Sequence, residues 1–177
     1  YKKSKYSLAV NSCTAALHLS LLYSGIKPND EVITTPMTFV STINSIVLTG
    51  AKPVLADINL NTFNIDPNEL IKKITKKTRA LIVVHIGGLP CEMDKIVKIC
   101  KIHNIKLIED CAHAIEAKYK NVHVGNFGVT GCYSFYSTKN LTTGEGGMIT
   151  CQNENIYKRL RVARLHGLSK DAWMRFL

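Results

Sequence analysis

Short β-branched runs alternate with segments of helical periodicity along this chain, and no other feature of the sequence constrains its fold as strongly. A strand, a helix and then another strand are typical of a parallel sheet that is covered by helices on both faces. We therefore predict an α/β fold with a mostly parallel sheet in a three-layer α/β/α arrangement. No repeat, low-complexity run or proline-rich linker interrupts the alternation, so we expect one domain over residues 1–177.

Glycine, proline and capping residues set the expected bounds of the elements. Gly25 and Gly50 are suited to left-handed caps after two helices, and Asp66-Pro67-Asn68-Glu69 opens a third with an acidic N-cap and a proline at the first helical position. The expected strands are Leu8–Val10, Glu31–Thr34, Pro53–Asp57, Arg79–His85, Lys106–Glu109, Cys132–Phe135 and Gly147–Cys151. The expected helices are Thr14–Ser24, Thr38–Thr49, Pro67–Ile74, Met93–His103 and Asn153–Leu165.

The composition excludes a disordered chain and a membrane-spanning one. Hydrophobic residues make up 46% of the 177 residues and charged residues 20%, which is enough to bury a core. Apolar runs such as Ala80–Val84 are far shorter than the about 20 residues of a membrane span, and no signal segment opens the chain. We therefore expect a cytoplasmic protein without a membrane partner.

The cysteines and the basic residues have ordinary structural interpretations. The six cysteines lie at least nine positions apart, so no Cys-x-x-Cys unit exists, and we expect reduced, buried thiols and no metal site. The net charge of +10 suits an anionic partner such as a phosphate or a nucleotide. One basic cluster surrounds a helix end without interleaved aromatic residues, so we expect solvated surface and no nucleic-acid partner. It comprises Lys72, Lys73, Lys76, Lys77 and Arg79.

Residues Gly131–Gly147, GCYSFYSTKNLTTGEGG, run from an apolar strand into a polar, glycine-rich loop that holds Lys139. A loop after a parallel strand is where the active sites of α/β proteins form. A lone lysine in a loop is usually solvated, but Ser134 near the strand end and the glycines around Lys139 favour a bound ligand. Schiff-base catalysis needs such a lysine, partly desolvated so that some of it is the free amine.

Asp110 and His113 mark a second candidate site. The stretch LIEDCAH places Asp110 at the carboxyl end of a buried strand, with His113 three residues further on. An aspartate at the end of a strand can simply cap the next turn. This structural interpretation explains Asp110 but gives His113 no role. A carboxylate at this place can also hold a pyridine nitrogen protonated, which makes a pyridoxal ring a better electron sink.

Two further stretches complete a candidate cofactor site. NSCTAAL turns a short strand into a helix and exposes the amides of Thr14 and Ala15, where a helix N-terminus can bind phosphate. TPMTFVST sets Phe39 at the opening of the next helix, either as a core residue or as a ring that stacks on a cofactor. With Lys139 and Asp110 at other strand ends of the same sheet, these pieces describe a site for pyridoxal 5′-phosphate (PLP).

The chain resembles the DegT/DnrJ/StrS-type sugar aminotransferases, which have the fold type I architecture of PLP enzymes. The pattern SF-x-x-x-KN-x-x-x-GEGG with ED-x-A-[QH]-A upstream is highly specific. The stretches that carry the resemblance are NSCTAALHL from Asn11, DEVITTPMTFVST from Asp30, GAKPVLADI from Gly50, VVHIGG from Val83, IEDCAHAIEA from Ile108, GCYSFYSTKNLTTGEGGMI from Gly131 and RLHGLS from Arg164.

This resemblance implies a role for each residue of the site. Lys139 is the lysine that forms the Schiff base with PLP, and Asp110 is the partner of the pyridine nitrogen. Phe39 stacks on the ring, and His113, a position that is glutamine in many relatives, lies by the ring hydroxyl. The residues that hold the phosphate are Thr14, Ala15 and Ser134. Three residues are candidates for substrate contact: His85, Glu145 and His166. For each of them, a structural polar residue whose hydrogen bonds are satisfied within the protein is an equally good interpretation.

The resemblance also implies a reaction. Lys139 releases the coenzyme to an amino donor, expected to be glutamate, and shuttles a proton, after which a nucleotide-linked keto-sugar takes up the amino group for polysaccharide or antibiotic synthesis. Relatives that are sugar dehydratases carry histidine in place of the lysine, so Lys139 favours transamination. A non-catalytic binding or regulatory module is the alternative outside enzymes.

Members of the family are considerably longer than this chain, and they build each active site across a homodimer interface. We therefore expect residues 1–177 to be the large, PLP-binding domain of a homodimeric enzyme, truncated at both ends and without the C-terminal small domain. The chain begins without a cap or turn before Tyr6–Val10 and ends on Trp173, Arg175 and Phe176, which is consistent with this expectation.

Overall fold

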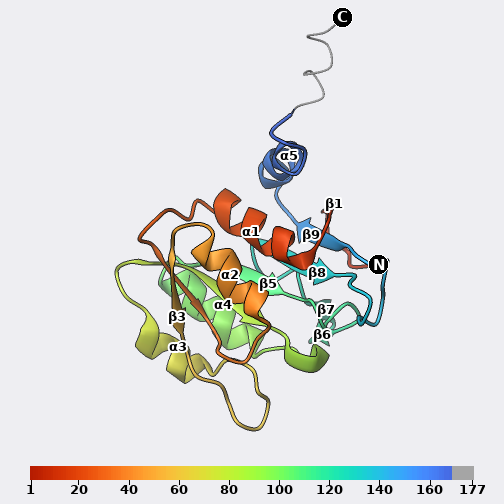
Figure 1. Ribbon diagram of the computed structural model, residues 1–177. Helices are drawn as coiled ribbons and strands as arrows, with labels where there is room; N and C mark the ends of the chain where they lie inside the picture. Colours follow the sequence, from red (N-terminus) through yellow and green to blue (C-terminus); the bar gives the residue numbers. More distant parts are fainter. Residues whose placement is uncertain (169–177) are drawn as a thin grey trace, which may run out of the picture.

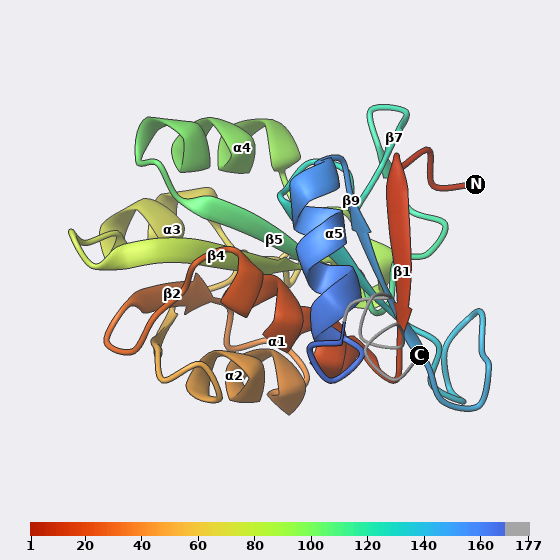
Figure 2. The ribbon, with the colours of Figure 1, turned by 90° about the horizontal axis from the view of Figure 1, so that it is seen from above.

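The computed structural model describes residues 1–168, so Trp173, Arg175 and Phe176 lie outside the described residues. One sheet has the strand order β1-β9-β8-β5-β4-β2-β3, and helices cover both of its faces (Figures 1 and 2). Its strands are β1 (Tyr6–Val10), β2 (Glu31–Thr34), β3 (Lys52–Leu55), β4 (Thr78–Val84), β5 (Lys106–Asp110), β8 (Thr130–Ser134) and β9 (Gly147–Cys151). The helices are α1 (Cys13–Tyr23), α2 (Val40–Val47), α3 (Pro67–Lys73), α4 (Met93–Ile102) and α5 (Glu154–Ala163).

Two hydrophobic clusters fill the space on either side of the sheet. Helices α1 and α2 lie on one face with α5 packed beside α1, and α3 and α4 lie on the opposite face (Figure 2). Leu17 of α1 belongs to the first cluster, and Leu70 of α3 and Ile96 of α4 belong to the second. Strand β4 is buried at six of its seven positions, as expected for a central parallel strand covered on both faces. The expected three-layer α/β fold is confirmed.

The strand directions follow from the connections. Strands β2, β3, β4, β5 and β8 pair in parallel, whereas β9 is antiparallel to β8, and β1 is antiparallel to β9. A parallel pair needs a crossover, usually a helix, but β8 and β9 are joined by a loop alone, so β9 runs back along β8. The sheet is therefore mostly parallel, with its antiparallel part at the β1–β9 edge.

The helix starts differ from expectation at one place that matters for the site. Helix α2 begins at Val40 rather than at Thr38, because Phe39 has extended backbone angles and is the N-cap. The sequence analysis also missed the short hairpin of β6 (Lys118–Tyr119) and β7 (Val122–His123) and the 3-10 turn η1 (Ile86–Gly88). Among the helices of residues 1–168, none combines the length and the apolar character that a membrane crossing requires.

Candidate active site

A cavity of about 570 Å³ opens where the parallel strands β2, β4, β5 and β8 end. Its walls come from the N-terminus of α1, the segment before α2, the ends of β4, β5 and β8, and the β8–β9 loop. Crevices at the carboxyl ends of parallel strands are the usual binding sites of open α/β sheets. Seven of the ten residues expected at the site line this cavity: Thr14, Phe39, Asp110, His113, Ser134, Lys139 and Glu145.

Lys139 lies in the β8–β9 loop, where its backbone N–H donates to the Tyr136 carbonyl at 2.9 Å and closes a turn. The residue is half-buried and lines the same cavity as Asp110. None of the ion pairs formed within residues 1–168 involves Lys139. Its amine is therefore placed at the cavity without a carboxylate counter-ion from the described part of the chain.

Asp110 ends β5 and is only 4% exposed. Its Oδ2 accepts the Thr42 hydroxyl hydrogen at 2.9 Å, and its Oδ1 accepts the Ala112 N–H at 3.1 Å. Burial raises the pKa of Asp110 above its usual value, while these two donors and the nearby His85 and His113 act in the opposite direction. The result is a carboxyl group that is anchored in the protein and borders the cavity.

Asp110→Asn should remove a pH-dependent loss of folding stability from the coenzyme-free, full-length protein. A carboxyl group whose pKa is higher in the folded state than in the unfolded state lowers stability once the pH exceeds the unfolded value. The free energy of unfolding of the variant, relative to wild type, should therefore rise as the pH increases above the unfolded-state pKa of about 4. Urea titrations across this range measure the difference. A difference that stays flat or falls with pH would contradict the raised pKa of Asp110.

His113 lines the cavity just beyond Asp110. Its Nδ1 accepts the Gly87 N–H at 3.4 Å, so the proton of the neutral ring lies on Nε2. Partial burial and the charge of Lys139 lower the pKa of His113, and Asp110 offsets part of this effect. Gly88 has a φ of +83°, and a Cβ there would lie 2.9 Å from the His113 carbonyl oxygen. The loop after β4 therefore supports His113 through two glycines.

Ser12 is the N-cap of α1, and its hydroxyl accepts the Ala15 N–H at 3.1 Å. Because Ser12 already takes this N–H, and because Ala15 is not among the lining residues, the structure does not bring Ala15 to the cavity. Thr14 does line it, together with Ser134 at the end of β8. The N-terminus of an 11-residue helix, with its free N–H groups and positive dipole end, therefore faces the expected phosphate position.

Gly147 holds this helix N-terminus close to the sheet. A Cβ at Gly147 would lie 2.4 Å from the backbone carbon of Ser12, far inside van der Waals contact. We expect Gly147→Ala to lower the free energy of unfolding by about 1–3 kcal/mol and to weaken coenzyme binding, because α1 must shift. Gly146→Ala is the matched control for stability, since the one atom that its Cβ would approach within 3 Å is the side-chain hydroxyl of Thr143 and no backbone atom. Equal effects of the two substitutions on the free energy of unfolding in urea would contradict this prediction.

Phe39 is 73% exposed, so the interpretation as a core residue is wrong, and its ring lines the cavity. Tyr136, 46% exposed, lines it too and was missed by the sequence analysis. Thr42, the donor to Asp110, was also missed. Thr42 follows Phe39 by three residues, so the two lie near the same face of α2, and this spacing was the available signal. The spacing alone does not show which strand end this face of α2 contacts.

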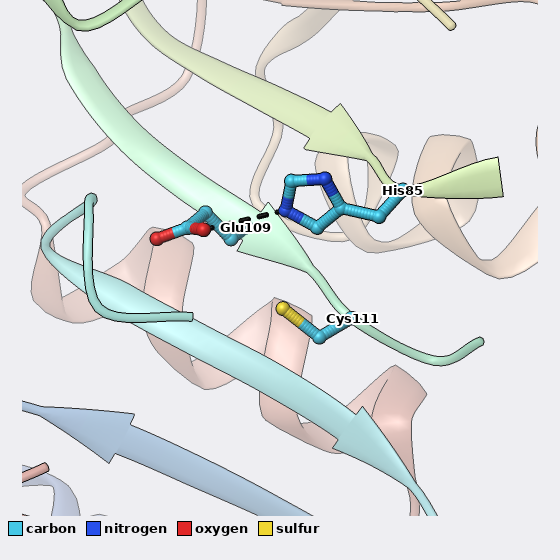
Figure 3. Close-up of side chains that lie close together, drawn as sticks. All are labelled: His85, Glu109 and Cys111. Carbon is cyan, nitrogen blue, oxygen red and sulfur yellow. Dashed lines mark hydrogen bonds and ion pairs between the residues drawn. The ribbon is translucent and has the colours of Figure 1, made fainter. Parts of the chain in front are cut away.

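His85, Glu109 and Cys111 form a separate, buried cluster (Figure 3). The His85 Nδ1 accepts the Cys91 N–H at 3.2 Å, so Nε2 carries the proton and donates to Glu109 Oε2 at 3.3 Å. His85 is fully buried and not among the residues that line the cavity. His166, exposed in the turn after α5, is not among them either.

Glu109 uses both of its oxygens within the protein. Besides His85, it accepts three backbone N–H groups at 2.6–2.7 Å, from Gly125, Phe127 and Gly128. The ligand atoms of His85, Glu109 and Cys111 lie within 4.8 Å of one another, a spacing that a metal ion could bridge. Since the carboxylate and the imidazole are already saturated with hydrogen bonds, the cluster has the chemistry of a structural core, not of an open metal site.

The residues that line the cavity fit a phosphorylated pyridine aldehyde. The N-terminus of α1 with Ser134 suits the phosphate, the exposed Phe39 ring suits a flat heteroaromatic ring, and the anchored Asp110 carboxylate suits the ring nitrogen. Lys139 supplies a primary amine in the same cavity. These groups come from four separate segments of the chain and meet only at the carboxyl ends of the strands.

Comparison with known proteins identifies the family of this chain. The model of the DegT/DnrJ/EryC1/StrS aminotransferase family matches residues 1–177. The spore coat polysaccharide biosynthesis protein SpsC of Bacillus subtilis is 51% identical over 173 residues, which are 98% of this chain and 44% of SpsC. This chain thus spans about half the length of the curated relatives that it matches.

Solved structures give the same result. The aminotransferase from Psychrobacter cryohalolentis superimposes with a TM-score of 0.94 at 40% identity, over 98% of this chain and 44% of that one. DesI, solved in the presence of its TDP-sugar product, has a TM-score of 0.90 at 30% identity, over 97% of this chain and 43% of DesI. Enzymes of the family use PLP, and the structural neighbours include PLP and PMP forms, which confirms the expected cofactor for the family. The chain belongs to the DegT/DnrJ/EryC1/StrS aminotransferase family.

Proposed function

We propose that this chain binds PLP in the cavity at the strand ends and that the full-length protein transfers an amino group from glutamate to a nucleotide-linked keto-sugar. The observation that carries the proposal is that the Lys139 amine and the buried Asp110 carboxylate line one cavity. Groups on opposite faces of the sheet would have excluded a shared ring between them. The family membership supports the same reaction class.

Five residues of the cavity have a task in this proposal. PLP supplies an aldehyde that takes up the amino group and a ring that withdraws electrons from the reacting carbon. Lys139 holds the coenzyme in place, gives way to the amino donor and moves a proton at the substrate carbon. Asp110 holds the ring nitrogen protonated, and Phe39 covers the ring. Thr14 and Ser134 bind the phosphate through the helix N-terminus and a hydroxyl.

The substrate class is proposed from three observations. The structural neighbours include a putative sugar aminotransferase, DesI was solved in the presence of its TDP-sugar product, and SpsC is a spore coat polysaccharide biosynthesis protein. The net charge of +10 suits a nucleoside diphosphate. We propose Glu145, which lines the cavity, as a substrate contact, and a homodimer as the assembly that completes the site. We propose glutamate as the amino donor and a homodimer as the assembly on the basis of the family resemblance.

An absorbance scan tests coenzyme binding directly. Adding PLP to the full-length protein should produce a visible band, and borohydride should then fix the coenzyme on Lys139, located by peptide mass spectrometry. A screen of nucleotide-linked keto-sugars with glutamate then identifies the substrate by the amino-sugar product. A protein that gives no band, or that is labelled on another lysine, would favour the non-catalytic binding module.

A further inference from the structure

Two threonine hydroxyls connect the cavity wall to Asp110. Thr42 is fully buried in α2, and its Oγ1 lies 2.9 Å from Asp110 Oδ2 and 2.7 Å from the Oγ1 of Thr38. A hydroxyl has a single hydrogen, so Thr42, which donates to the carboxylate, must accept from Thr38. Thr38 lines the cavity. The chain of donors therefore runs from the cavity wall through Thr42 to Asp110.

With Asp110 ionised, this is the direction in which the donors must run. An ionised aspartate accepts hydrogen bonds only, and Asp110 accepts from Ala112 and the Cys13 thiol at Oδ1 and from Thr42 at Oδ2. Burial opposes ionisation, whereas each donor favours it, and a second hydroxyl behind the first strengthens that donor. The threonine pair thus counteracts the burial of Asp110.

The same contact sets the spacing between two walls of the cavity. Thr42 lies about one turn after Phe39, the N-cap of α2, and Asp110 is the last residue of β5. A hydrogen bond of 2.9 Å between the two elements fixes the start of α2 against the end of β5. The backbone of Phe39 and the Asp110 carboxylate are therefore held at a defined separation.

We propose that Thr42, backed by Thr38, is a positioning residue that keeps Asp110 ionised and in place for the nitrogen of a bound heteroaromatic ring. The role toward a bound ring rests on the proposed function, but the effect of Thr42 on the ionisation of Asp110 does not. Other groups act on Asp110 as well, and they stay unchanged in the variants below. They are Cys13 of α1, His85 after β4, Cys111 beside Asp110, His113 and Cys132 of β8. Glu109, the preceding residue, and Lys139, which lines the same cavity, stay unchanged too.

The test is the ionisation of Asp110 in the coenzyme-free, full-length protein. Aspartate carboxyl carbons are labelled with ¹³C and followed by NMR against pH, and the Asp110 signal is assigned by its loss in Asp110→Asn. Thr42→Val keeps the shape but removes the donor, and it should raise the midpoint by about one to two pH units. Thr42→Ser should restore the wild-type midpoint. Thr38→Val, which needs no change in the core, should raise the midpoint by a smaller amount.

Thr34→Val is the matched control, because Thr34 is equally buried and its hydroxyl donates to a backbone carbonyl, that of Ile82. It should leave the Asp110 midpoint unchanged. The proposal is overturned if neither Thr42→Val nor Thr38→Val moves the midpoint, or if Thr34→Val moves it as far. PLP titration of the wild type is read separately: a wild type that binds no PLP would remove the proposed function, while the midpoints still decide the role of Thr42.

Discussion

Lys139→Arg should abolish transamination, with a fall in rate of about 10⁴-fold, the upper end of what a general acid–base group contributes. Arginine keeps the positive charge and nearly the length of lysine. Its guanidinium does not lose its proton in proteins, so it can neither form the covalent bond to the coenzyme nor carry a proton to the substrate carbon. Borohydride should no longer fix PLP on the protein. Both the rate of the half-reaction with glutamate and the label are measured.

Lys118→Arg is the control for this experiment, because Lys118 is exposed in the β6–β7 hairpin and is not among the residues that line the cavity. It should retain activity and labelling. Unfolding of Lys139→Arg by urea should match wild type within about 0.5 kcal/mol, since Lys139 lies in a loop and forms no ion pair within residues 1–168. Substantial remaining activity would exclude Lys139 as the residue that holds the coenzyme.

Glu109→Gln should give a large loss of stability, about 3–5 kcal/mol, although it changes only one atom of the side chain. One pair of N–H groups points at Oε1, and the other oxygen accepts from Gly125 and from His85. The NH₂ group of glutamine must face one of these sets, which puts donor against donor in a fully buried place. His85 cannot relieve the conflict cheaply, because its Nδ1 is engaged by Cys91.

Glu92→Gln is the control, since Glu92 pairs with Lys95 at the exposed start of α4. A surface ion pair contributes about 0–1 kcal/mol, so this variant should unfold close to wild type. Urea unfolding of both variants in the coenzyme-free, full-length protein measures the difference. If Glu109→Gln proves as stable as Glu92→Gln, the interpretation of the His85–Glu109 cluster as a structural core is wrong.

Local signals in the sequence predicted the elements well. Gly25, Gly50 and the Asp66-Pro67 start act on the backbone of their own neighbours, so their effect is readable without knowledge of the fold. The placement of Lys139, Asp110 and Phe39 at one cavity was also predicted, because parallel strands present their carboxyl ends at the same edge of a sheet. The roles of these residues stay predictions until the experiments above are done.

Other features depend on partners that are remote in the sequence. His85 follows a strand and was a candidate for substrate contact, but its ring turns to Glu109, which lies 24 positions away. Thr42 meets Asp110 across 68 positions. Neither of these two pairings leaves a mark in the local pattern.

The sequence by itself determined the alternation of strands and helices, the three-layer sheet and the set of chemical groups at the strand ends, because propensity, capping and hydrophobic period act between near neighbours. Only the tertiary structure decided the antiparallel edge, the direction of the hydrogen bonds around Asp110 and the enclosure of Glu109 by four donors. These features depend on how segments that are far apart in the sequence pack together. The packing also decides which hydrogen-bond donors still need a partner once they are buried.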